Sequence, residues 1–136
     1  MKQANPINIA TIDHVVIRVN DLGSMIDWYV TVLGCRLERG PGEMRLAQLR
    51  AGTSLIDLVD ASGPLGKKSG GKPDHTHPNL DHVCLQVVPW SEDAILAHLQ
   101  RHNVSHDGVA DRYGAKGQGP SVYIQDPEGN SVELKG

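Results

Sequence analysis

Short segments rich in branched aliphatic residues recur along the chain, separated by segments rich in glycine, proline and polar residues. The aliphatic segments predict strands, because β-branched side chains pack well on a pleated surface. The expected strands cover residues 12–19, 35–39, 45–50, 53–59, 80–87, 109–113, 120–125 and 130–135. Residues 21–33 carry apolar side chains at helical spacing and predict a helix, and residues 91–102 predict a second one.

Residues suited to helix ends flank both helical segments. Asp21 or Ser24 can cap the N-terminus of the first helix, and Gly34 stands where a left-handed residue commonly ends one. Ser91 is a candidate cap for the second helix, and two acidic residues follow it in the first turn. These signals support the predicted boundaries of both helices.

The chain contains an internal repeat. The sequence IDHVVIRV at residues 12–19 resembles LDHVCLQV at residues 80–87, and LIDL at residues 55–58 matches SVEL at residues 131–134. Each half therefore carries one histidine early and one acid late. Two similarities in the same order predict a duplicated α+β fold, a single domain over residues 10–136. Its two modules are expected at about residues 10–60 and 80–136.

A polar segment at residues 61–79 joins the two predicted modules. It is rich in glycine, proline and lysine and lacks apolar periodicity, so it predicts a loop. Long loops inside a compact domain are often functional or disordered, and this one could be a solvated linker or a lid. The linker is the simpler interpretation.

Strand parity separates the candidate chemistry from the expected core. Successive side chains of a strand point to opposite faces, so Val15 and Ile17 would face the helix and leave His14 on the other face. The same reasoning places His82 and Glu133 on the polar face of the second module. Buried charge is costly unless it is paired or bound to metal. If the polar faces curve towards each other, the histidines and acids would converge on one divalent cation: Zn, Ni, Co, Mn or Fe.

Composition excludes several other classes of function. The 136 residues carry a net charge of −3 with no basic block, so neither nucleic acid nor an acidic membrane surface is an expected partner. Two cysteines are too few for a disulfide framework, which favours a reducing compartment. No signal peptide or membrane-spanning apolar run is evident, so we expect a cytoplasmic protein.

These motifs resemble those of the vicinal oxygen chelate superfamily, which includes glyoxalase I, fosfomycin-resistance proteins, extradiol dioxygenases and bleomycin-resistance proteins. The resemblance rests on the two Asp-His segments, on Trp28-Tyr29 with Leu33-Gly34, and on DPEGN before VEL at residues 126–134. It implies two βαβββ modules forming a curved mixed sheet around a metal cleft. It also implies a homodimer, with the modules pairing within or between chains.

The resemblance implies roles for individual residues. The metal ligands would be His14, His82, Glu133 and Asp57, and Glu133 would also be the catalytic general base. Glyoxalase I usually has glutamate where Asp57 stands, so Asp57 would either ligate directly or hydrogen-bond to a metal-bound water. Three ligands would match the fosfomycin-resistance proteins. Anionic parts of the substrate would be bound by Arg18, Lys116 and Tyr123.

The resemblance leaves the reaction open among several chemistries. The first expectation is a metal-dependent lyase or isomerase of glyoxalase I type, acting on a small oxygen-chelating substrate such as a glutathione conjugate. One alternative is epoxide opening of the fosfomycin-resistance type. Another is metal-independent binding of a small molecule, as in bleomycin resistance, although those relatives lack the ligand quartet. An extradiol dioxygenase commonly has a longer chain.

Overall fold

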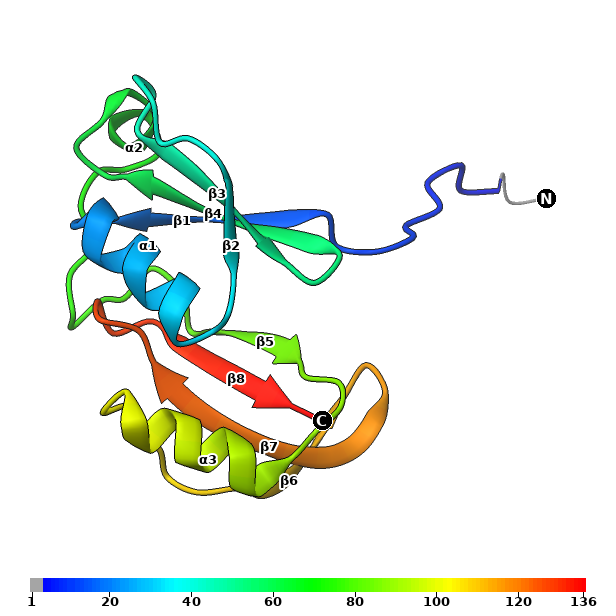
Figure 1. Cartoon of the computed structure of the whole chain (residues 1–136). Helices are drawn as coiled ribbons and strands as arrows, with labels where there is room; N and C mark the ends of the chain where they lie inside the picture. The colour runs from blue at the N-terminus through cyan, green and yellow to red at the C-terminus, as the bar shows by residue number, and fades with distance from the viewer. Residues whose placement is uncertain (1–3) are drawn as a thin grey trace.

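The computed structural model describes residues 4–136, which form two modules of one sheet and one long helix each (Figure 1). In the first module, β1 runs parallel to β4, and the strands follow the order β1-β4-β3-β2. Its elements are β1 (His14–Val19), α1 (Leu22–Thr31), β2 (Arg36–Arg39), β3 (Leu46–Ala51) and β4 (Ser54–Asp60).

The second module repeats this arrangement element by element. Its first and last strands are parallel neighbours, and the strands follow the order β5-β8-β7-β6. Its elements are β5 (His82–Gln86), α3 (Glu92–Arg101), β6 (Ala110–Gly114), β7 (Gly117–Gln125) and β8 (Ser131–Lys135). The predicted α+β fold of two βαβββ modules is therefore confirmed.

Two local features differ from the sequence expectation. The segment between the modules, expected to be a loop, contains the short helix α2 (Pro64–Lys68), which has a proline in its first turn. Strand β7 begins at Gly117, three residues before the expected residue 120, and forms a hairpin with β6 around Ala115 and Lys116. The hairpin places Lys116 at a tight turn at one end of the second sheet.

The ends of α1 follow the predicted chemistry. The Asp21 carboxylate accepts hydrogen bonds from the Ser24 backbone N–H at 3.1 Å and from its hydroxyl at 2.9 Å. Gly34 has a φ of +72°, and the Cys35 N–H donates to the Tyr29 carbonyl at 3.0 Å to close the helix. Within residues 4–136, every helix is too short or too polar to cross a bilayer.

Helix α1 packs against the apolar layers of both sheets. Its Met25 and Tyr29 are fully buried in the core of the first module. Its Trp28 and Leu33, the latter just past the helix end, also pack against the buried residues of the second module. Leu85 of β5 contacts both cores. The two sheets therefore turn their apolar faces towards a shared layer, and the opposite, polar faces point away from it.

The turn between β7 and β8 fixes the second module to α1. The Tyr29 hydroxyl donates to the buried carboxylate of Asp126 at 2.8 Å. The Glu128 carboxylate accepts from the backbone N–H groups of Asn20 at 2.7 Å and Asp21 at 2.9 Å. Asp126 also accepts from Asn130, at 2.9 Å from the side-chain amide and 3.0 Å from the backbone. The DPEGN segment thus forms the predicted turn and also joins the two modules.

Replacing Tyr29 by Phe should lower the free energy of unfolding by about 1–3 kcal/mol, because Asp126 would lose a donor in a buried place. Urea unfolding of Tyr29→Phe measures this change. Tyr113→Phe is the matched control, because the Tyr113 side chain is 78% exposed. Equal stability of the two variants would show that the Tyr29–Asp126 hydrogen bond contributes nothing to the joint.

Candidate functional site

The two predicted histidine ligands occupy equivalent positions, at the first residue of β1 and of β5. The Nδ1 atom of His14 lies 2.7 Å from the carboxylate of Asp13, and that of His82 lies 2.7 Å from the carboxylate of Asp81. An ionised carboxylate can only accept, so Nδ1 carries the proton in each pair. The lone pair of each Nε2 atom remains free for a metal ion.

The two acids also occupy equivalent positions on the neighbouring strands. Asp57 pairs with Val16, two residues after His14, and Glu133 pairs with Cys84, two residues after His82. In the second module, the His82 Nε2 atom lies 3.5 Å from the Glu133 carboxylate. Each sheet thus presents one imidazole nitrogen and one carboxylate on its polar face.

The pKa of His14 lies above its ordinary value. The hydrogen bond to Asp13 is the main cause, partial burial opposes it, and the negative charge of Asp57 adds to it. The effect of Asp57 also places that carboxylate within electrostatic reach of the imidazole. His14 and Asp57 therefore lie on the same side of the first sheet, near enough for the charge of Asp57 to act on the imidazole.

Asp57 has an unsatisfied oxygen. Its side chain is 3% exposed, its Oδ2 atom accepts from the Gln48 amide at 3.2 Å, and its Oδ1 atom has no hydrogen-bond partner among residues 4–136. A buried carboxylate oxygen without a partner is costly. A bound cation would remove that cost, so this donor fits a metal ion.

Glu133 is 5% exposed and, unlike Asp57, is well supplied with donors. Burial raises the pKa of Glu133, but hydrogen bonds from Ser121, whose hydroxyl lies at 2.7 Å, and from Tyr123 lower it, as do the charges of His82 and Arg112. The net pKa lies below the ordinary value. Glu133 is therefore an ionised carboxylate at neutral pH, able to bind a cation or accept a proton.

The structure brings the predicted ligands together as two pairs and not as one quartet. His14 and Asp57 belong to the first sheet, and His82 and Glu133 belong to the second. Across residues 4–136, no three His, Cys, Asp or Glu side chains are grouped closely enough to hold a metal ion. The physical reason is the shared apolar layer around α1, which turns the two polar faces away from each other.

The predicted substrate-binding residues divide between the same two faces. The Arg18 guanidinium donates to the Gly71 carbonyl of the inter-module segment at 3.0 Å. Lys116 lines a pocket of about 270 Å³ with His82 and Glu133. The Tyr123 ring packs edge-on against His82, with ring centroids 5.4 Å apart.

Sequence reasoning missed several side chains that support the site. Gln48 and Ser121 each donate to a predicted acid, and Arg112 lies over the Tyr123 ring at 4.7 Å. Strand pairing would have indicated Gln48, which stands directly opposite Asp57. The repeated Asp-His order was a visible sign of the role of Asp13 and Asp81. Nothing in the sequence marked Arg112.

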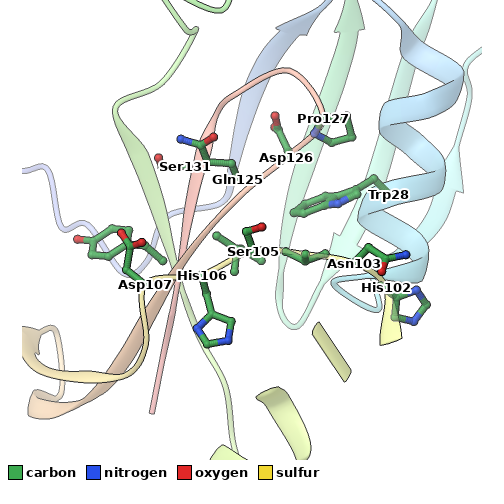
Figure 2. A pocket seen from close by; sticks show the side chains of 13 residues that line it. Trp28, His102, Asn103, Ser105, His106, Asp107, Gln125, Asp126, Pro127 and Ser131 are labelled. Carbon is green, nitrogen blue, oxygen red and sulfur yellow. The ribbon is translucent and has the colours of Figure 1, made fainter. Parts of the chain in front are cut away.

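A wide groove lies away from both histidine–acid pairs. It has a volume of about 800 Å³ and is bordered by Trp28, residues 102–107 and the turn after β7. Figure 2 shows the Trp28 indole at one side of this groove, near Asp126 and Pro127. None of the predicted metal ligands lines it.

The duplicated fold and the two histidine–acid pairs define a class of protein. Residues 11–134 match the sequence profile of the Glyoxalase/Bleomycin resistance protein/Dioxygenase superfamily. The chain belongs to this superfamily, and the resemblance noted from the sequence is confirmed.

Individual relatives span nearly the whole chain. The glyoxalase domain-containing protein RDO1 of Mycosarcoma maydis is 28% identical over 134 residues, covering 98% of this chain and 72% of the relative. The virulence protein STM3117 of Salmonella typhimurium is 29% identical over 126 residues, covering 93% and 83%. Its crystal structure superposes with a TM-score of 0.76 at 25% identity, covering 95% of this chain and 98% of the other. Lactoylglutathione lyase from Agrobacterium tumefaciens shares the fold, with a TM-score of 0.66 at 21% identity and 94% coverage of each chain.

Asp13→Asn should lower the pKa of His14, because the substitution removes the charged acceptor of its Nδ1–H. The pKa of His14 is measured in metal-free protein by following the NMR signals of its ring protons as the pH is changed. Asp27→Asn is the control, because it removes the same charge from an exposed position on α1 and should leave the pKa of His14 unchanged. If the pKa of His14 is the same in Asp13→Asn as in the wild type, the hydrogen bond between Asp13 and His14 is contradicted.

Proposed function

We propose that the protein is a divalent-metal-dependent lyase or isomerase of glyoxalase I type, acting on a small substrate with two adjacent oxygen atoms. One observation carries this proposal. Two repeat-related pairs, His14 with Asp57 and His82 with Glu133, each offer a free Nε2 atom and a carboxylate on a polar sheet face. The partnerless Oδ1 atom of Asp57 adds a donor that favours a cation.

The proposed ligands are His14, His82 and Glu133, with Asp57 as the fourth. Two imidazole nitrogens and one or two carboxylates suit Zn, Ni, Co, Mn or Fe. When bound, such a cation acts as a Lewis acid that stabilises negative charge developing on substrate oxygen atoms.

A second copy of the chain would complete the ligand set. The two pairs lie on separate sheets of one chain, so each chain holds half of a site. Strands β1 and β5 are edge strands, and each has one side without a strand neighbour among the described residues. We propose a homodimer in which the first module of one copy faces the second module of the other. Two equivalent sites would result.

Residues of the second module would carry the proton transfer. Glu133 is ionised, and Ser121 and Tyr123 hold its carboxylate, so it can take a proton from one substrate carbon and return it to the next. Lys116 lines the same pocket and would bind a remote anionic group. The carboxylates of a glutathione conjugate would suit Lys116 and, from the facing module, Arg18.

Turnover of the hemithioacetal of methylglyoxal and glutathione tests the reaction, in protein loaded separately with Zn, Ni, Co, Mn or Fe. Glu133→Gln should lower kcat/KM at least about 100-fold, because an amide cannot accept the proton. Glu43→Gln, an exposed change of the same kind, should have no effect. Absence of turnover with all five metals would remove this reaction from consideration.

Mixing two inactive variants tests the shared site. His14→Ala and Glu133→Gln should each lose turnover when alone. In a hybrid dimer, one site would carry both substitutions and the other neither. Random exchange at equal amounts should therefore restore about a quarter of the wild-type rate. Sites built within one chain would restore nothing.

A further inference from the structure

Residues 4–12, called here the N-terminal arm, extend from the body of the molecule before β1 (Figure 1). The arm exposes three large apolar side chains: Ile7 is 69% exposed, Ile9 is 84% exposed and Ile12 is 71% exposed. The arm's side-chain hydrogen bonds are a local one from the Ile7 N–H to Asn5 and one from the Ser54 hydroxyl to the Ile12 carbonyl. An apolar segment of this kind marks an interaction surface.

A cleft of about 510 Å³ opens between the two modules at the root of the arm. Thr11 and Ile12 form part of its rim, and most of its remaining lining is aliphatic, including Val15 and Leu33 from the first module and Leu85 from the second. His14 and Cys84, from the two polar faces, also border it. The cleft is thus apolar, and it lies where the two halves of the proposed site begin.

The arm of the same chain leaves this cleft rather than filling it, because Ile7 and Ile9 remain exposed beyond the rim. A second copy that supplies the ligands facing His14 would lie next to the arm, since only Asp13 separates the arm from His14. Nine extended residues reach about 30 Å, enough to cross from one copy to the other. In a twofold dimer, each arm would then meet the cleft of its partner.

We propose that the N-terminal arm of one copy docks into the cleft of a second copy, with Ile7 and Ile9 as the anchoring side chains. This inference rests on the two-copy site proposed above and names the surface that holds the copies together. Docking would bury the exposed isoleucines and the apolar lining of the cleft together. It would also fix the start of β1, and hence His14, against the partner chain.

Substitution of the anchors tests the docking. The double variant Ile7→Asn/Ile9→Asn should weaken the dimer at least tenfold, measured by light scattering after size-exclusion chromatography over a dilution series. Val88→Asn is the matched control, because Val88 is 77% exposed outside both the arm and the cleft. It should dimerise like the wild type. If the dimers of the arm variant and of the control have the same dissociation constant, the docking is overturned.

Cross-linking locates the arm. Ile9→Cys introduces a thiol at an anchor, and of the two cysteines that line the cleft, Cys84 is exposed and Cys35 is buried. A short bismaleimide should join the two thiols between copies and give a dimer on a denaturing gel, with the linked peptides identified by mass spectrometry. The dimer band should be absent in Ile9→Cys/Cys84→Ser and in the wild type. A linkage within one chain, or an Ile9→Cys variant that gives no dimer band, would overturn the docking.

The two levels of the proposal can fail separately. A wild-type protein that is monomeric at all concentrations would overturn the two-copy site and the docking together. A wild-type dimer that ignores the arm substitutions would overturn the docking alone. If the wild-type protein dimerises and cross-links as expected but does not turn over the hemithioacetal, the proposed reaction is overturned and the docking remains supported.

Discussion

The packing of α1 against two sheets at once determines how the rest of the molecule is arranged. Met25 and Tyr29 complete the first core, and Trp28 and Leu33 extend into the second. Both sheets must turn their apolar faces towards this helix to exclude water from it. Alternation along each strand then places every predicted metal ligand on the outward faces. The same hydrophobic layer that joins the modules therefore separates the two halves of the candidate site.

The two modules differ in the hydrogen-bond partners of their equivalent acids, Asp57 and Glu133. Glu133 accepts from Ser121 and Tyr123, and its lowered pKa keeps it an ionised carboxylate. Asp57 has one donor, Gln48, and one partnerless oxygen, which suits a group that holds a cation. Equivalent positions in the repeat thus carry different chemistry.

Most elements of the fold could be predicted from the sequence, because local residue patterns and the internal repeat specify them. The strands, the two long helices and the Asp21 cap followed from residue types and spacing, and the repeat indicated which strands are equivalent. The short helix α2 was missed because its five residues, PLGKK, include a proline and a glycine and only one large apolar side chain, so they show no apolar periodicity. The separation of the ligand pairs was also missed. It depends on which neighbours Trp28 and Leu33 contact across the modules, and apolar periodicity within one helix carries no information about that.

The matching register of β1 with β4 and of β5 with β8 has an evolutionary consequence. Each module presents a complete histidine–acid pair at the same two positions of the same strand pair. Two identical polypeptides of half this length, facing each other, would already supply four donors to one cation. Once two such halves are joined in one chain, the two equivalent acids can differ in sequence and surroundings, as Asp57 and Glu133 do.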